Sequence, residues 1–493
     1  MSKRTAIIDI GSNSARMAIF ERSSRFGFHL IMETKSRVRI GEGAYNFGGV
    51  LQEAALLRAF RALQEFGYII QNFHCTKTLC IATSALRDAP NGTAFIKKIK
   101  DELGIHIKII EGSKEAYYGA VGAINYLKPI EDGITIDIGG GSTELAKIEH
   151  GKITDTLSLN IGTVRLKELF FDKKRPLNEI RSFIDDELSK MPSSFSSPTM
   201  IGIGGTLRSL SKIIMEKMSY PLKTVHAFEY PLHEYTSFID AIVTSDVLGL
   251  KHLGVRKDRY DTMREGCIIF QSLYQKCDAK LLITSGAGIR EGAYMCDLLR
   301  SFHHIFAPDF KLSLRSLKDR FSITEKEDAY VKKIACLLFE ALKPLHAIPS
   351  SYLFELSVAA ELHSIGIKLG FYQNQLHGFY FIINNLNYGF SHEQKMLIAM
   401  LIKFHANKLP TLEEVIPYQK LLPDFQTLTW LSFILTLAKA INADFRKGKI
   451  ACVYQNHTLV IEAEHPLFLA KEQIKQLIKP ASFAIIIKEC VEK

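Results

Sequence analysis

A repeated segment constrains the fold of this chain more than any other feature of its sequence. Residues 6–21, AIIDIGSNSARMAIFE, align without gaps with residues 134–149, ITIDIGGGSTELAKIE, and seven of the sixteen positions are identical. Each copy reads as an apolar strand, a turn of glycine and small polar residues, and a second strand. Two related hairpins indicate duplicated halves, so we place one domain at 1–127 and a second at 128–303.

Both halves alternate strand-like and helix-like segments, which predicts an α/β architecture. Apolar residues at three- and four-residue spacing predict helices at 53–66 and 94–103. The predicted strands are 5–10, 16–21, 78–83, 107–110, 133–138, 143–148, 199–203 and 279–284.

The last third of the chain has a different character. From about residue 304 glycines become sparse, and the segments with a helical pattern of apolar residues become longer, as at 329–342 and 427–442. We therefore predict a helical domain at 304–440. Residues 441–493 are predicted to form a small α/β appendix. Its elements are a hairpin of 450–454 and 459–462, a helix at 469–478 and an apolar strand at 483–487.

Composition excludes several classes of protein. Lys and Arg number 62 against 52 Asp and Glu, and this surplus favours acidic partners but equally fits a solvated surface. The 8 cysteines form no CxxC pair or Cys/His cluster, which argues against a zinc ribbon or a disulfide framework. The first apolar stretch is short and interrupted by Asp9, and later apolar runs are far below the ~20 residues of a membrane span. We therefore expect a cytoplasmic protein without a membrane partner.

The two glycine turns are candidate phosphate-binding loops. Glycine lets the backbone approach a ligand, and successive N–H groups in such a turn form a concavity that binds anions. One glycine hairpin is usually only a hairpin, but two matching copies that face across a cleft could hold a phosphate from both sides. The candidates are Gly11, Ser12, Asn13 and Ser14 in the first turn and Gly139, Gly140, Gly141 and Ser142 in the second.

An aspartate precedes each turn at the end of an apolar strand. A buried carboxylate is costly unless it is paired or coordinated, and a hard divalent cation is its natural partner next to phosphates. The alternative is an aspartate that caps its own turn through hydrogen bonds. For Asp9 both interpretations stay open, whereas for Asp137 we favour a metal ligand.

Two later segments repeat the layout of a strand that runs into glycines. Residues 200–206, MIGIGGT, precede a helix that we expect to begin near Leu207, and the start of a helix after glycines is a ready anion site. Residues 282–291, LITSGAGIRE, are similar. Neither segment matches GxxxxGK[ST] or GxGxxG, so a P-loop or a dinucleotide fold is unsupported. The first segment adds Gly204, Gly205 and Thr206 to the phosphate-binding candidates.

Taken together, these motifs resemble those of the exopolyphosphatase and guanosine pentaphosphate phosphatase (Ppx/GppA) family of the actin-like superfamily. The resemblance implies two duplicated actin-like (ribonuclease H-like) domains that face a cleft, then a helical HD-like domain and a small α/β segment. The matching segments are DIGSNS (9–14), ATSALRDA (82–89), EGSKEA (111–116), DIGGGSTEL (137–145), GIGGT (202–206), DRYD (258–261) and SGAGIREG (285–292).

The resemblance also implies an activity. We expect hydrolytic release of terminal phosphate from inorganic polyphosphate, and from pppGpp to give ppGpp, with Mg²⁺ or Mn²⁺ as cofactor. A pppGpp-specific phosphohydrolase, an actin-like ATP-dependent kinase and a catalytically silent regulator are the alternatives. A homodimer is expected and a nucleic-acid partner is not. Basic clusters at 97–100, 173–175 and 256–259 are candidates for a polyphosphate track.

Hydrolysis needs a base that activates water, and a carboxylate at the cleft suits this role. From the residues alone, Glu111 and Glu115 are equal candidates, and an ordinary first-turn glutamate is the alternative for Glu115. The resemblance places Glu115 in the catalytic position, Glu144 as a second acidic residue that orients the nucleophile, and Arg87 as a phosphate ligand. A solvated strand residue and a surface charge are the alternatives for Glu144 and Arg87.

The helical domain departs from a working HD site. Such a site needs adjacent His and Asp, and the matching pair here is His363-Ser364. A serine hydroxyl is a poor substitute for a carboxylate ligand. We therefore predict that His363 is structural and that this domain only covers the cleft.

Overall fold

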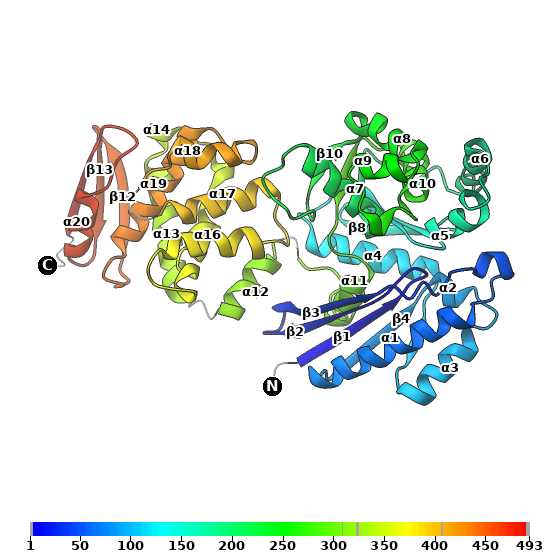
Figure 1. Ribbon diagram of the computed structural model, residues 1–493. Coiled ribbons are helices and arrows are strands. Elements are labelled where there is room, and N and C mark those ends of the chain that lie inside the picture. Colours follow the sequence, from blue (N-terminus) through cyan, green and yellow to red (C-terminus); the bar gives the residue numbers. More distant parts are fainter. Residues whose placement is uncertain (1–2, 308, 322–324, 406–407, 490–493) are drawn as a thin grey trace. The chain divides into compact units, whose positions relative to one another are not determined.

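The computed structural model describes residues 3–307, 309–321, 325–405 and 408–489. The chain divides into two compact units, Met1–Phe310 and Lys311–Lys493 (Figure 1). The first unit holds two β-sheets with their helices. The second holds a helical body and a three-stranded sheet.

The first sheet has the strand order β3-β2-β1-β4-β5. Strands β1 and β2 form the predicted antiparallel hairpin, and β4 and β5 continue the sheet in parallel. Apolar side chains of α1 and α3 form one core with those of the strands. The bounds are β1 (Lys3–Ile10), β2 (Ala15–Arg22), β3 (Phe28–Ser36), β4 (Lys77–Ala82), β5 (Ile107–Ile109), α1 (Glu53–Asn72), α2 (Ser84–Arg87) and α3 (Gly92–Leu103).

The second sheet has the order β10-β11-β9-β6-β7-β8 and repeats this plan. Its β6–β7 hairpin is antiparallel, and β9 and β11 follow in parallel, so the predicted duplication is confirmed. The bounds are β6 (Gly133–Ile138), β7 (Thr143–Glu149), β8 (Lys152–Leu159), β9 (Thr199–Ile203), β10 (Glu229–Pro231), β11 (Leu281–Thr284), α5 (Thr163–Leu166), α6 (Leu177–Leu188), α7 (Gly204–Lys217), α8 (Thr236–Thr244), α9 (Val247–His252) and α10 (Met263–Lys276).

Two helices pack together and join the halves of the first unit. Helix α4 (Gly112–Tyr126) follows the first sheet in sequence but packs against β6, β7 and β8 of the second. Helix α11 (Ile289–Leu298) follows the second sheet and packs against α4 and β1. One expectation is corrected. The helix that was expected to begin near Leu207 begins at Gly204, so Gly204–Thr206 form its first turn.

In the second unit, α13, α15, α17 and α19 pack on one another, and the ring of Trp430 stacks on Phe483 near the small sheet. The predicted helical region and the hairpin of the appendix are confirmed, and β14 adds in parallel to β13. The bounds are α12 (Leu312–Phe321), α13 (Glu325–Ala341), α14 (Lys343–His346), α15 (Leu353–Leu362), α16 (Asn374–Asn385), α17 (His392–Lys403), α18 (Leu412–Val415), α19 (Phe425–Ile441), β12 (Ile450–Gln455), β13 (Thr458–Ala463), α20 (Phe468–Lys475) and β14 (Ala484–Glu489).

No single helix in the described ranges is long and apolar enough to cross a membrane. The segment Leu412–Leu421 and helix α19 meet that criterion of length and composition only as a pair, which is bent by 109°.

Candidate active site

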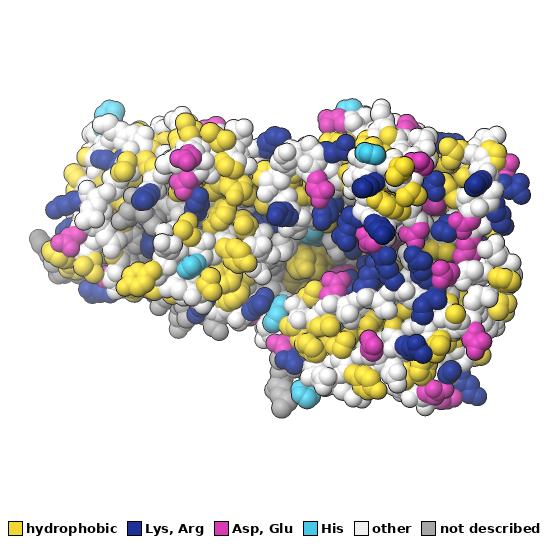
Figure 2. Space-filling view, viewed as in Figure 1, with side chains coloured by type: hydrophobic (Ala, Val, Ile, Leu, Met, Phe, Trp, Pro, Cys, Tyr) yellow, Lys and Arg dark blue, Asp and Glu magenta, His cyan; other side chains and the backbone are white. Residues whose placement is uncertain are grey.

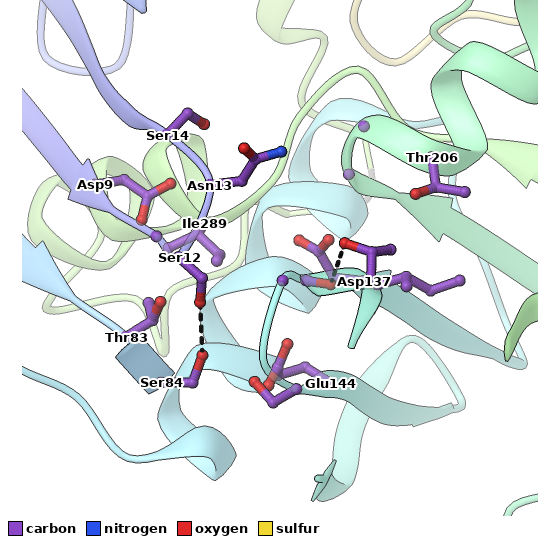
Figure 3. A pocket seen from close by; sticks show the side chains of 18 of the residues that line it. Asp9, Ser12, Asn13, Ser14, Thr83, Ser84, Asp137, Glu144, Thr206 and Ile289 are labelled. Carbon is purple, nitrogen blue, oxygen red and sulfur yellow. Dashed lines mark hydrogen bonds between the residues drawn. The ribbon is translucent and has the colours of Figure 1, made fainter. Parts of the chain in front are cut away.

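A cavity lies between the two halves of the first unit, where the glycine turns of both hairpins meet (Figure 3). Most of the predicted site residues line it, although they come from several separate segments of the chain. Arg87 and Gly141 are predicted site residues that are not among the lining residues. Those that line it are Asp9, Gly11, Ser12, Asn13, Ser14, Glu115, Asp137, Gly139, Gly140, Ser142, Glu144, Gly204, Gly205 and Thr206.

The carboxylates of this cavity are buried close to one another. Burial first, and then the negative charge of Glu144, hold the pKa of Glu115 well above its ordinary value. Asp9 and Asp137 also raise the pKa of Glu115, while Arg87 lowers it. Burial likewise raises the pKa of Asp9, to about 6, and the pKa values of Asp137 and Glu144. The site therefore concentrates negative charge that a proton or a cation must balance.

The structure separates the two candidates for the general base. Glu115 lies in the first turn of α4, is buried, and lines the cavity. Glu111 is the N-cap residue of the same helix, and its side chain is exposed. Arg87 is the cation paired with Glu115, since its Nη1 lies 3.6 Å from Glu115 Oε2 and donates to the carbonyl oxygen of Ile110. Arg87 is thus directed at the candidate base.

Glycines are required where the two halves approach each other. A β-carbon at Gly140 would lie 2.7 Å from Ser12 Cβ, so the second glycine turn presses against the first. Gly204 has a left-handed φ of 79°, and a β-carbon there would lie 2.2 Å from Asp137 Oδ1. These contacts bring the start of α7 and both turns within reach of one small anion.

Three cations line the cavity: Arg16, Lys35 and Arg259. Sequence analysis missed Arg16 and Lys35, and named Arg259 only as part of the basic cluster at 256–259. Burial lowers the pKa of Lys35 to about 8, and the charges of Arg16 and Arg259 contribute to this lowering. A β-carbon at Gly205 would lie 2.5 Å from Arg259 Nη2, so this guanidinium covers the N-terminus of α7. Figure 2 shows Lys and Arg side chains gathered along the junction of the two halves. Arg259 belongs to the DRYD motif, whereas β3, which carries Lys35, gave no signal.

The donors in the cavity fit a divalent cation that binds together with phosphate. Among the described residues, no group of three or more His, Cys, Asp or Glu side chains is arranged to hold a metal ion by itself. Mg²⁺ usually keeps several waters and binds through one or two carboxylates plus substrate phosphates. Asp137 and Asp9, each at the end of a strand and next to a glycine turn, match that requirement.

In the second unit, His363 Nδ1 lies 2.8 Å from the carbonyl oxygen of Ala360 and 3.5 Å from Asp328 Oδ1. Ser364 Oγ donates to the same carboxylate oxygen over 3.2 Å. His363 is therefore held by hydrogen bonds within its own helical region.

A cleft between duplicated α/β halves, with phosphate-sized glycine turns and buried carboxylates, defines a phosphoryl-transfer protein of the actin-like class. The Ppx/GppA phosphatase family model matches residues 18–301, and the model for domain III of Ppx/GppA phosphatases matches residues 311–475. This chain belongs to the Ppx/GppA phosphatase family.

Relatives agree with this assignment. A guanosine-5'-triphosphate,3'-diphosphate pyrophosphatase of Photobacterium profundum is 25% identical over 417 residues, or 83% of this chain and 82% of the relative. The crystal structure of the Aquifex aeolicus member of the Ppx/GppA family is 28% identical, with a TM-score of 0.53 over 62% of this chain and 100% of that one. An exopolyphosphatase of Cytophaga hutchinsonii, 23% identical, shares the fold, with a TM-score of 0.55 over 60% of this chain and 98% of that one.

Proposed function

We propose that this chain hydrolyses the terminal phosphoanhydride bond of inorganic polyphosphate, and also converts pppGpp to ppGpp. The observation that carries the proposal is the place of Glu115. Its carboxylate is buried in the cavity that both glycine turns line, and its Oε2 has no hydrogen-bond partner among the described residues. A carboxylate with a raised pKa and an oxygen that accepts no hydrogen bond, beside a phosphate site, suits a base that takes a proton from water.

The backbone N–H groups of the two turns and of the start of α7 would bind the oxygens of the terminal phosphate. Glu115 takes a proton from water, whose oxygen forms a bond to the terminal phosphorus. The bridging P–O bond breaks, and the shortened chain leaves with the electron pair on its oxygen. Glu144 would orient the water. Arg87 stays beside Glu115 and limits the rise of its pKa.

We infer that Asp137 would be the main ligand of a divalent cation and Asp9 the second candidate ligand. The cation would be Mg²⁺, or Mn²⁺ instead of it. When bound, this cation would neutralise charge on the phosphate oxygens. The two aspartates are buried on opposite hairpins, and the charge of Asp137 raises the pKa of Asp9, so a cation held by either carboxylate would also reduce their mutual repulsion.

The cations Arg16, Lys35 and Arg259 favour a substrate with several phosphates in a row. Of the three basic clusters, the one at 256–259 supplies a lining residue, and residues 97–100 and 173–175 supply none. A polyphosphate track would therefore begin at Arg259. The name of the Photobacterium profundum relative supports pppGpp as a second substrate. The homodimer and the cytoplasmic location expected above stay predictions.

One experiment tests the function. Phosphate release is measured from long polyphosphate and from pppGpp with one purified sample, with Mg²⁺, with EDTA, and over a salt series. We expect both substrates to be hydrolysed, EDTA to abolish turnover, and KM for polyphosphate to rise steeply with salt, because binding of a polyanion releases counterions. Use of pppGpp alone, with a KM insensitive to salt, would support the pppGpp-specific alternative. Phosphate transfer that depends on ATP and an acceptor would indicate a kinase.

A further inference from the structure

Three polar side chains form one row across the second sheet. Asp137 on β6 pairs directly with Glu144 on β7, and Glu144 pairs directly with Ser158 on β8. Residues that lie opposite each other in antiparallel strands project from the same face of the sheet. The row that begins with the two cavity carboxylates therefore ends with a serine hydroxyl on the edge strand β8. Helix α4 packs over these strands.

Ser158 contacts the site on two sides. Its Oγ donates a hydrogen bond of 3.0 Å to Glu144 Oε1. Its side chain also lies flush against the first residue of α4, because a β-carbon at Gly112 would lie 2.3 Å from Ser158 Cβ and 2.4 Å from its Oγ. Gly112 precedes Glu115 by three residues, so both lie on one face of the first helical turn. Ser158 thus contacts Glu144 directly and the segment that carries Glu115.

We propose that Ser158 is a positioning residue for hydrolysis, which orients the Glu144 carboxylate and sets the distance between Glu144 and Glu115. The proposal rests on the function proposed above. Ser158 does not line the cavity and touches no reacting atom, so it acts only through the two glutamates.

The hydrogen bond has a definite electrostatic consequence. Burial raises the pKa of Glu144, and the bond from Ser158 lowers it because the hydroxyl stabilises the ionised carboxylate. Other groups face Glu144 too: Ser142 and Arg87 lower its pKa and Asp137 raises it. Without the hydroxyl, the hydrogen bond from the edge strand that fixes the orientation of the Glu144 carboxylate is lost.

The test compares Ser158→Ala with Thr154→Ala. Thr154 is on the same strand and donates a hydrogen bond of 2.8 Å to Glu149, an exposed pair that does not line the cavity. We expect Ser158→Ala to lower kcat by about tenfold to a hundredfold, the value of a hydrogen bond to a charged group, with KM nearly unchanged. Thr154→Ala should match the wild type in both.

A second pair of variants separates positioning from packing. Gly112→Ala should lower both melting temperature and kcat, since its β-carbon meets Ser158. Gly112→Ala combined with Ser158→Gly restores one β-carbon at the contact, so the melting temperature should recover while kcat stays impaired. A wild-type kcat in Ser158→Ala, or its full recovery in the double variant, would overturn the proposal. Failure of the proposed function differs from both results, because the wild type itself would then release no phosphate.

Discussion

At the scale of single residues, the buried carboxylates that serve the proposed activity also lower the stability of the folded chain. Burial and neighbouring negative charge raise the pKa of Glu115 in the folded state, so folding favours its protonated form. Stability from such a group is fully present below the pKa of the unfolded chain and is lost as pH rises through the folded pKa. At pH 8 the wild type has therefore lost part of its free energy of unfolding, and a neutral side chain at this position avoids that loss.

Glu115→Gln should therefore be inactive and more stable at the same time. We expect kcat to fall by at least about a hundredfold, as for loss of a general base, with KM retained. In EDTA, urea unfolding at pH 8 should give a larger free energy of unfolding than for the wild type, and this difference should shrink toward pH 4. Steady-state kinetics and the unfolding series measure the two effects separately.

The matched control is Glu111→Gln in the same motif. Glu111 is exposed at the N-cap of α4 and does not line the cavity, so kcat should stay within about twofold of the wild type, as for most surface substitutions. If Glu111→Gln lost activity and Glu115→Gln kept it, the role of the base would move to Glu111.

At the scale of elements, strands that are runs of apolar residues were predictable, whereas three edge strands of the first unit were not. Strands β1, β6, β9 and β11 are runs of apolar residues in the interior of their sheets, and their predicted ranges agree with the structure to within two residues at either end. Strands β3, β8 and β10 lie at sheet edges and were not predicted, whereas the edge strand β5, predicted at 107–110, is observed at Ile107–Ile109. Strand β8, KITDTLSL, mixes polar and apolar residues because much of it meets solvent, and such a pattern has little period for sequence analysis to detect.

The N-terminus of α7 offers a prediction at this scale. Gly204 has a left-handed φ, and a β-carbon there would also strike the Asp137 carboxylate. Gly104 is the C-cap of α3 with φ of 67° and nothing within 4 Å of such a β-carbon. Gly104→Ala should cost about 1 kcal/mol of stability and leave kcat unchanged. Gly204→Ala should cost more and reduce kcat by at least about tenfold, because Asp137 must move. Equal effects of the two variants on kcat would mean that Asp137 need not occupy its present place.

At the scale of the whole first unit, the duplicated hairpins made half of the site predictable. The repeat identifies Asp9, Asp137 and both glycine turns, because the same local sequence forms the same strand, turn and strand in each half and lines the cavity from both. Arg16, Lys35 and Arg259 converge only when the two halves meet. Arg259 was marked by its motif and its basic cluster, but no local pattern distinguishes Arg16 or Lys35 from an ordinary surface cation, and the same limit left Ser158 unnoticed.

Ion pairs join the two halves beside the cavity. Arg37 Nη2 lies 2.7 Å from Asp258 Oδ2, and Arg39 Nη2 lies 2.7 Å from Asp261 Oδ2. Both aspartates flank Arg259 in the DRYD motif, so the contact that holds the halves together also fixes a cavity cation. The side chains of both pairs are partly exposed, and exposed pairs contribute only about 0.2–1 kcal/mol each. Their loss should change substrate binding more than the stability of the fold.

Replacing the two aspartates distinguishes closure of the cleft from simple charge attraction. Asp258→Asn with Asp261→Asn makes the cavity rim more positive, so attraction alone would lower KM for polyphosphate. If the ion pairs hold the halves around the substrate, KM should instead rise by about twofold to tenfold, the value of two exposed pairs, while kcat is retained. Arg300→Ala, which breaks an exposed pair with Asp297 within the C-terminal part of the first unit, should leave KM unchanged. The sign of the change in KM at low salt therefore decides whether closure or charge governs entry to this site.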